Sequence, residues 1–384
     1  MNIISDTKSL KTFCKTLTKG DYITIDTEFI RERTYYPRLC LIQVANDDVE
    51  AIIDPLAEDI DLSPLFKILQ NKKITKVLHG GRQDVEIFYY LTGQIPTSLF
   101  DTQIAGMVCG FGDQIGYENM IKRILNVQID KGSRYTDWSL RPLSDKQLNY
   151  ALADVTHLRD AYKHICHRLK ELKRETWVAE ETQILSSPST YDNPPELAWE
   201  RLKINTRKRR ALGILQQVAA WREQTAQDCD EPRGRVLRDK ALAEIATNPP
   251  KKIEDLRNIR DIHPSFFEGD RPKQLLEVIK KARSLKQDEC PKRKKTKPLP
   301  SHIGPASEML RVLLKLKCDE HEVAPKVLAS SADLDQIAAL GGKADVPALK
   351  GWRHDVFGKD ALLLVEGKIG FVLENNRIQI KNLG

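Results

Sequence analysis

The sequence has few cysteines and no long apolar run. Seven cysteines are scattered through 384 residues, an odd number without a C-x-x-C pair. This argues against a disulfide framework and against a zinc site, and it indicates a reducing compartment. No apolar stretch approaches the ~20 residues that a membrane helix needs, and the N-terminus lacks the apolar core of a signal peptide. We therefore expect a cytoplasmic protein without a membrane partner.

Two common nucleotide-binding signatures are also missing. The segment Gly110–Gly116 holds three glycines, but it neither has the order G-x-G-x-x-G nor follows a predicted strand, so we interpret it as a loop between helices. No G-x-x-x-x-G-K-[ST] run, the mark of a P-loop, is present. We therefore do not expect the protein to use ATP.

What the chain does contain is an uneven distribution of charge. Apolar residues make up 41% and charged residues 30%, as in ordinary globular proteins, and the length suggests two or three domains. The net charge is +7, yet residues 201–299 hold 26 Lys or Arg against 14 Asp or Glu, so this region nets +12 and the remainder −5. The pattern indicates a polyanion-binding region beside an acidic one. A lysine-rich solvated surface would give the same count.

The first half of the chain predicts a mixed α/β sheet. Three strands follow one another closely, a fourth comes after a helical segment, and helices surround them. We place helices over 1–20, 62–70 and 83–91, a mainly helical pattern over 101–173, and strands over 21–30, 39–44, 51–54 and 74–79. Near the C-terminus, the apolar segments 361–365 and 370–373 suggest a short hairpin.

The helix that begins after Ser144 carries two polar residues of interest. Ser144 and Gln147 have the spacing of a capping box, and an apolar stripe starts at Leu148. Tyr150 and Asp154 are four residues apart, so they share a face, which lies about 200–240° round the helix from Leu148. We expect them away from the main core. A hydrogen bond between the two on the helix surface is the plainer alternative.

Asp26 and Glu28 lie on one face of the first predicted strand, because side chains two apart point the same way. Two aligned carboxylates repel each other, and a divalent cation would remove that repulsion. Hard oxygen ligands favour Mg²⁺ or Mn²⁺. The alternative is a polar strand end near solvent.

Asp84 extends this set to four carboxylates on separate elements. It follows a predicted strand and two glycines, at the start of a helix. Together with Asp26, Glu28 and Asp154 it suits a site for two metal ions ~3.5–4 Å apart, which can clamp the attacking and leaving oxygens of a phosphoryl displacement. Tyr150 then has a role in orienting the attacking water.

Three motifs resemble those of the ribonuclease D family, in the DEDD exonuclease superfamily. Ile25–Pro37 is similar to its first motif, Leu78–Asp84 to its second, and Tyr150–Asp154 to its third in the Tyr-x-x-x-Asp form. Asn149 stands where the histidine form of the superfamily has its histidine. Asp137–Leu143 also matches. The resemblance implies a ribonuclease-H-like α/β exonuclease domain, a mixed sheet flanked by helices.

The rest of the chain resembles the mostly α-helical HRDC domain, twice. The middle block is similar over Ala219–Glu223, Pro232–Leu237, Asp239 and Leu242–Ala246, and the last block, more divergent, over Val323–Leu328, Ala332–Leu334 and Gly351–Arg353. We therefore expect an exonuclease domain over 1–173, a linker over 174–205, a first HRDC domain over 206–287, a basic linker over 288–301 and an HRDC-like domain over 302–384.

The resemblance also assigns roles in the site. Asp26, Glu28, Asp84 and Asp154 bind two Mg²⁺ or Mn²⁺ ions: Asp26 bridges both, Glu28 and Asp154 complete the site of the attacking water, and Asp84 serves the leaving group. Tyr150 acts with them. Expected contacts with the substrate come from Phe29, Arg31, Arg33, Tyr35, Tyr36 and His79. For Phe29 a core position is as compatible, and for His79 a structural role is favoured over metal ligation.

The function implied is a 3′→5′ exoribonuclease that releases 5′-mononucleotides and trims tRNA precursors and other structured RNAs, as a monomer. A DNA 3′→5′ exonuclease and a non-catalytic RNA-binding scaffold are the alternatives. Because all the carboxylates precede residue 155 and the basic excess follows residue 200, we expect that a chain ending near Ser186 keeps the chemistry and loses much of the grip on RNA.

Overall fold

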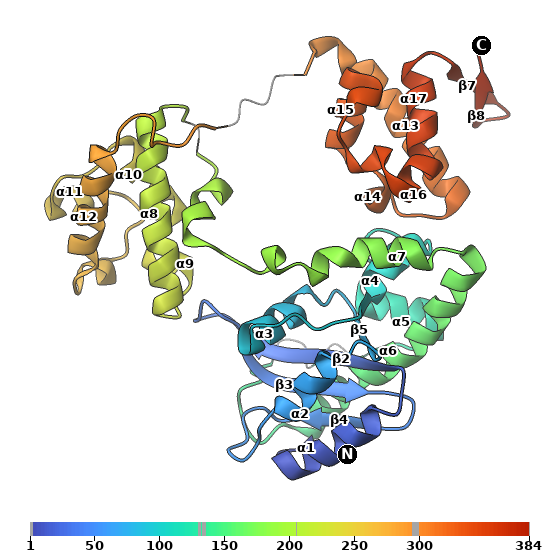
Figure 1. Cartoon of the computed structure of the whole chain (residues 1–384), viewed down its shortest axis with the longest axis horizontal. Helices are drawn as coiled ribbons and strands as arrows, with labels where there is room; N and C mark the ends of the chain where they lie inside the picture. Colours follow the sequence, from blue (N-terminus) through green and yellow to red (C-terminus); the bar gives the residue numbers. More distant parts are fainter. Residues whose placement is uncertain (1–2, 130–131, 133–135, 205, 294–298, 384) are drawn as a thin grey trace.

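The structure, a computed structural model, describes residues 3–129, 132, 136–204, 206–293 and 299–383. Figure 1 shows three bodies: a sheet with its helices, and two helical blocks beyond it. No helix of the described residues is both long and apolar enough to span a membrane.

The N-terminal body is built on a six-stranded mixed sheet with the strand order β1-β4-β3-β2-β5-β6. β2 pairs antiparallel with β3 and parallel with β5, so it lies at the centre, where it is covered on both faces. The strands are β1 (Ile3–Ile4), β2 (Tyr22–Ile30), β3 (Arg38–Ala45), β4 (Glu50–Ile53), β5 (Thr75–Leu78) and β6 (Leu99–Asp101). The predicted mixed sheet is confirmed, but β1 and β6 were missed, because two or three residues are too few to show a period.

Helices cover both faces of this sheet. On one face, Ile23 and Ile25 of β2 share a core with Leu10 of α1 (Thr7–Leu17) and Phe88 of α3 (Arg82–Thr92). On the other, the hydroxyl of Thr24 donates to the carbonyl of Val155 over 2.9 Å. The covering helices there are α4 (Thr102–Val108), α5 (Tyr117–Leu125) and α6 (Asp145–Leu172), while α2 (Ser63–Leu69) completes the first layer. Thr24, Asp26 and Glu28 alternate along β2, so all three face α6.

The capping box at the start of α6 is confirmed, since Ser144 and Gln147 each bond to the other's backbone. The expectation that Asp154 lies away from the core is wrong: it is buried, 8% exposed. The buried arc of α6 includes Ala151 and Leu158, which extend it round the helix from Leu148 towards Asp154. This carboxylate therefore points at the sheet.

The segment after α6 is folded rather than extended as a connector: up to Tyr191 it packs on the N-terminal body, and from Ala198 it packs into the core of the middle block. It contains α7 (Glu175–Thr182) and the 3-10 helices η1 (Gln183–Ser186), η2 (Pro188–Thr190) and η3 (Pro195–Arg201). Val178 belongs to the same core as Leu169, and Tyr191 packs into the core of the sheet.

The two helical blocks have cores of different kinds. The middle block has a core of its own around Leu215 and Leu242, and its elements are α8 (Arg209–Asp228), α9 (Arg233–Val236), α10 (Asp239–Thr247), α11 (Ile253–Arg257), η4 (Pro264–Phe267) and α12 (Arg271–Ser284). The elements of the last block are η5 (Ser301–Ile303), α13 (Gly304–His321), α14 (Pro325–Leu328), α15 (Ser331–Leu340), η6 (Gly341–Lys343), η7 (Pro347–Leu349), α16 (Gly351–Arg353), the π-helical turn η8 (His354–Gly358), α17 (Lys359–Val365), β7 (Ile369–Glu374) and β8 (Arg377–Asn382).

The hairpin at the C-terminus is formed differently from the prediction. Residues 361–365 are helical, within α17, and β7 pairs instead with β8. Asn375 and Asn376 between the strands have φ values of 50° and 58°, the conformation that a two-residue type I′ turn requires. The Asn-Asn pair is therefore the turn of the hairpin, rather than the Glu366-Gly367 pair that separates the two predicted segments.

The last block shares its core with the N-terminal body. Val108, Leu169 and Val178 lie in one cluster with Leu310 and Val323. Hydrogen bonds reinforce the junction: the guanidinium of Arg174 donates to the carbonyls of Val108 (2.8 Å) and His321 (2.6 Å), and the rings of Trp177 and Trp352 stack with centroids 4.2 Å apart.

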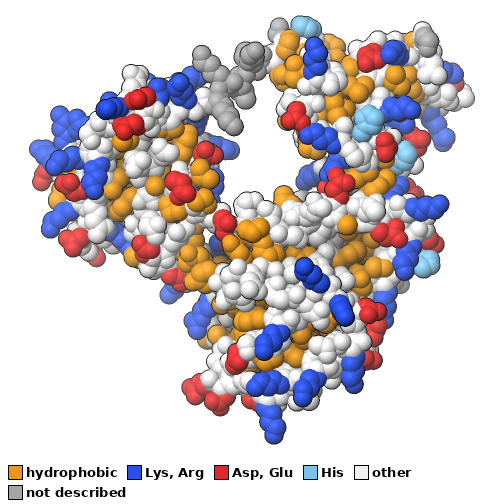
Figure 2. Space-filling model, viewed as in Figure 1, with side chains coloured by type: hydrophobic (Ala, Val, Ile, Leu, Met, Phe, Trp, Pro, Cys, Tyr) orange, Lys and Arg blue, Asp and Glu red, His pale blue; other side chains and the backbone are white. Residues whose placement is uncertain are grey.

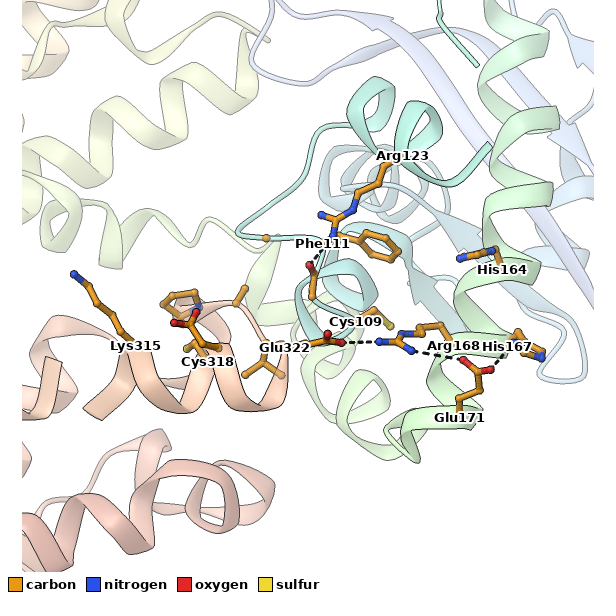
Figure 3. Close-up of a pocket in the computed structure, with 16 residues that line it drawn as sticks. Cys109, Phe111, Arg123, His164, His167, Arg168, Glu171, Lys315, Cys318 and Glu322 are labelled. Carbon is orange, nitrogen blue, oxygen red and sulfur yellow. Dashed lines mark hydrogen bonds and ion pairs between the residues drawn. The ribbon is translucent and has the colours of Figure 1, made fainter. Parts of the chain in front are cut away.

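A cavity of about 830 Å³ opens at this junction, between α4–α6 and α13. Figure 3 shows Arg168 at its centre, paired with Glu322 of the last block (2.6 Å) and with Glu171 on its own helix. Positive and negative side chains are mixed along its wall, so the cavity has no single sign of charge.

Candidate active site

Three of the four predicted carboxylates meet between β2 and α6. Asp26, Glu28 and Asp154 each offer an oxygen, and these oxygens lie within 4.8 Å of one another. β2 presents Asp26 and Glu28 on the face towards α6, and the helix returns Asp154 to the same place. A bulge between Glu28 and Phe29 ends the regular pairing with β3 and bends the strand just beyond the cluster.

The carboxylates of the cluster repel one another. Burial raises the pKa of Asp26 well above its ordinary value, and repulsion from Asp84, Asp154 and Glu28 raises it further. The side-chain amide of Gln43, directly opposite Asp26 on β3, is fully buried and finds no partner among the described residues. A partly buried, acidic group of oxygens beside an unpaired amide has the donor chemistry of a divalent cation site.

Asp84 lies beside this cluster, on α3. It is buried, and the hydroxyl of Thr27 donates to it. Burial raises the pKa of Asp84 to about 6, although the bond from Thr27 opposes the rise. Asp84 is also the largest source of repulsion on Asp26. The structure therefore brings all four carboxylates into electrostatic contact, with three in direct ligating range of one another.

The turn between β5 and α3 holds Asp84 in place. Gly80 has a φ of +62°, and a Cβ on Gly81 would lie 2.5 Å from the Cβ of Leu78. The carboxylate of Asp101, at the end of β6, accepts from the backbone N–H groups of Gly80 (3.0 Å) and Gly81 (2.9 Å). Asp101 was missed from the sequence because its place beside this turn depends on the pairing of β6 with β5.

Tyr150 stands one turn before Asp154 on α6, partly buried, with its ring 6.1 Å from that of Trp138. It also lines a cavity of about 510 Å³ on the outer side of α6. The tyrosine thus lines this cavity from the same helix that carries Asp154.

Tyr117, the first residue of α5, was not predicted and contacts the site directly. Its hydroxyl donates to the carbonyl of Asp154 over 2.5 Å and accepts from the backbone of Leu158, the two groups that pair in a regular helix. Burial raises its pKa far above the ordinary value, and the charges of Asp154 and Asp26 add to the rise. No local pattern marks Tyr117, because its position depends on the packing of α5 against α6.

Three of the predicted substrate contacts have partners inside the protein. Arg31 makes a two-pronged ion pair with Glu86, at 2.8 and 3.0 Å. Tyr36 stacks on Tyr90 with ring centroids 3.8 Å apart. Tyr35 is 5% exposed and turns towards the middle block. A role for these side chains in binding substrate stays an untested prediction, and their contacts favour a structural one.

Tyr35 joins the N-terminal body to the middle block. Its hydroxyl donates to Glu223, whose carboxylate is fully buried and paired with Arg233 at 2.6 Å. Burial alone would raise the pKa of Glu223, but the bonds from Arg233 and Tyr35 hold it below the ordinary value. Asp230 accepts from the backbone N–H groups of Tyr35 and Tyr36.

The remaining predicted contacts differ in exposure. Phe29 is partly buried against the core of the sheet, and Arg33 is exposed. His79 packs edge-on to Tyr117, with ring centroids 5.5 Å apart, and its Nδ1 lies 3.0 Å from the hydroxyl of Thr102. These contacts of His79 agree with a structural role.

Comparisons with known proteins point to the same chemistry. Residues 1–170 match the family described as 3′-5′ exonuclease, and residues 211–279 match the HRDC domain. The chain is 44% identical to ribonuclease D of Bartonella henselae over 383 residues, which cover 100% of this chain and 94% of the relative. It is 44% identical to ribonuclease D of Gluconacetobacter diazotrophicus, with 98% and 96% covered.

A solved structure agrees over the same length. The crystal structure of Escherichia coli RNase D, 28% identical, superposes with a TM-score of 0.80 and covers 96% of this chain and 99% of its own. The fold and the carboxylates thus define a 3′→5′ exonuclease that carries an HRDC domain. The chain belongs to the ribonuclease D family.

Membership of this family confirms the predicted enzyme class. The chain is a 3′→5′ exoribonuclease, a hydrolase of phosphodiester bonds. The family uses divalent metal ions, and the acidic cluster fits that use.

Proposed function

We propose that this enzyme trims the 3′ ends of tRNA precursors and other structured RNAs and releases 5′-mononucleotides. The carrying observation is the partly buried group of Asp26, Glu28 and Asp154 within a ribonuclease D fold. The related Escherichia coli protein is described as an exoribonuclease involved in structured RNA processing. Cytoplasmic location and a monomeric state stay predictions.

The chain's own residues divide the work of hydrolysis. Asp26, Glu28 and Asp154 would hold one Mg²⁺ or Mn²⁺, and Asp26 and Asp84 a second. When bound, such ions supply an activated water and stabilise the charge on the departing oxygen. The hydroxyl of Tyr150 would hold the attacking water in line, while Thr27 fixes the orientation of Asp84 by its hydrogen bond.

Chemistry and RNA binding are assigned to different parts of the chain. We propose an exonuclease domain over 1–173 and HRDC-type domains over 206–287 and 302–384. The net charge of +12 over residues 201–299 supports a grip on phosphates by the middle block. Figure 2 shows Lys and Arg side chains gathered over that block.

The first test removes a charge from the cluster. Asp26→Asn should abolish the release of nucleotides from 3′-labelled RNA across a Mg²⁺ titration, while RNA affinity stays near that of the parent, because affinity comes mostly from phosphate contacts elsewhere. Turnover near the parent rate would contradict the assignment. Matched RNA and DNA strands are compared in the same assay, and faster hydrolysis of the DNA strand would favour a DNA exonuclease. Lack of any hydrolysis by the parent would favour a non-catalytic RNA-binding scaffold.

The second test concerns the hydroxyl of Tyr150. Tyr150→Phe keeps the ring and should lower the single-turnover rate by about 10²-fold, the low end for a positioned proton-handling group. Tyr89→Phe is the matched control, because the hydroxyl of that partly buried tyrosine donates to Asp192 over 2.8 Å and the charge that acts on it is that of Asp192. A Tyr150→Phe rate within about twofold of the parent would reduce this residue to packing.

A further inference from the structure

The groove on the outer side of α6 is distinct from the carboxylate cluster but adjoins it. Its lining, over a volume of about 510 Å³, consists of Gln128, Ile129, Lys146, Asn149, Tyr150, Ala153 and His157. This volume lies within the roughly 300–1,000 Å³ of small-molecule sites. Tyr150 connects the groove to the cluster. It lines the groove, and it lies one helical turn before Asp154, which belongs to the cluster.

The groove has a regular wall. Lys146, Asn149, Tyr150, Ala153 and His157 recur at the spacing of one helix face, and the chain after α5 supplies the opposite wall. From Lys146 to His157 the helix rises about 16 Å. The groove is therefore a track along the helix rather than a closed pocket.

The chemistry of this track is opposite to that of the cluster beside it. None of the seven described residues that line the groove is acidic, whereas the cluster consists of carboxylates. A lysine and a histidine lie near its two ends, amides of Asn149 and Gln128 line its sides, and Tyr150 offers an aromatic ring. Basic side chains that alternate with an aromatic platform are the features that bind single-stranded nucleic acid.

We infer that this track binds the nucleotides of the RNA that lie 5′ of the terminal two, with Lys146 and His157 on their phosphates. The inference rests on the proposed function: when the 3′-terminal nucleotide occupies the carboxylate site, the strand can continue only on its 5′ side. Lys146 and Asn149 are exposed, so they can be reached by a strand that leaves along α6.

The test compares two lengths of substrate. The double variant Lys146→Ala/His157→Ala should raise the KM for a pentanucleotide roughly 10-fold with little change in kcat, and leave the KM for a dinucleotide within about twofold, since a dinucleotide does not reach the track. The variant Lys146→Arg/His157→Ala should keep part of the pentanucleotide affinity that the double alanine variant loses. Lys11→Ala, an exposed lysine of α1 on the far side of the sheet, is the control and should change neither value.

A binding measurement separates this inference from the proposed function. In the Asp26→Asn background, which binds without turnover, Lys146→Ala should weaken pentanucleotide binding and lower the slope of log K against log salt by ~0.7, the value for one phosphate of a single strand. Unchanged pentanucleotide affinity and slope would overturn the track even if hydrolysis by the parent is confirmed. Equal losses of affinity for the dinucleotide and the pentanucleotide would also overturn the inference, because they would place the terminal nucleotides in the track.

Discussion

At the scale of single residues, the site depends on groups that carry no charge as well as on its carboxylates. Thr27 donates to Asp84, and Tyr117 bonds the backbone at Asp154. Gln43 lies opposite Asp26 with an unpaired amide. Thr27 and Tyr117 position the acids through these bonds, and Tyr117 also packs edge-on to His79.

Tyr117→Phe tests this positioning role. Loss of the hydroxyl removes the bond to the carbonyl of Asp154 while the ring stays packed, so the carboxylate should be held less firmly. We expect the Mg²⁺ concentration for half-maximal activity to rise several-fold, and direct Mn²⁺ binding, followed by paramagnetic resonance, to weaken in parallel. Tyr89→Phe again serves as control. A lower kcat with unchanged Mn²⁺ binding would contradict the role.

Because of Asp84, the free energy of unfolding should depend on pH when a chelator has removed divalent ions. Its folded-state pKa of about 6 exceeds the ordinary 3.8, so between these values the folded protein binds more protons than the unfolded chain. The contribution of Asp84 to the free energy of unfolding is therefore fully present below about pH 4, and it is lost as the pH rises through about 6. Asp84→Asn should be more stable than the parent at pH 7 in chelator, by roughly 2–3 kcal/mol.

The measurement is denaturant unfolding of both proteins between pH 4 and pH 7, with and without Mg²⁺. The stability that Asp84→Asn gains over the parent should shrink towards pH 4. Saturating Mg²⁺ should stabilise the parent more than the variant. A difference between the two proteins that is constant with pH would show that Asp84 has an ordinary pKa.

At the scale of elements, the site is the meeting point of three unrelated segments. β2 brings two carboxylates, α6 one, and the turn from β5 to α3 the fourth. That turn is closed by Asp101 and allows no side chain at Gly81, where a Cβ would contact Leu78. The geometry of a loop therefore fixes the place of Asp84.

Gly81→Ala should disturb both stability and activity. The clash with Leu78 must shift the turn, at a cost of about 1–3 kcal/mol, and the shift displaces Asp84. Gly116→Ala is the matched control, because that glycine, at the start of α5, has a φ of −72° and open space around its Cβ position. Thermal melts and exonuclease rates for the two variants check the prediction, and equal behaviour would contradict it.

At the scale of the whole molecule, both helical blocks are joined to the body that carries the site. The middle block is attached through Tyr35 and Glu223. The last block shares a continuous core with α4, α6 and α7, and Trp352 stacks on Trp177. The domains are distinct in sequence but not independent in packing.

This packing changes the expectation for a chain that ends near Ser186. The truncation would expose Val108, Leu169 and Val178, which the last block covers. We now predict that the shortened protein melts well below the full chain and binds a hydrophobic dye, and that its loss of activity on short strands follows its loss of structure. Circular dichroism and dye binding on the sample used for activity check this. A well-folded, active fragment would contradict it.

The sequence by itself determined the local chemistry of the site. Alternation in β2 placed Asp26 and Glu28 on one face, and the spacing from Tyr150 to Asp154 placed both on one side of α6, because strand and helix periods fix such relations within about one turn. The capping box of α6 and the mixed sheet followed from the same local rules.

Only the tertiary structure decided what lies next to these groups. That Asp154 faces the sheet, that Tyr117 reaches its backbone and that Asp101 closes the turn before Asp84 all depend on how distant segments pack. The same holds for Tyr35, whose motif suggested a substrate contact and whose ring is buried against the middle block. Packing depends on the combined shapes of many side chains far apart in the chain, and no local period records it.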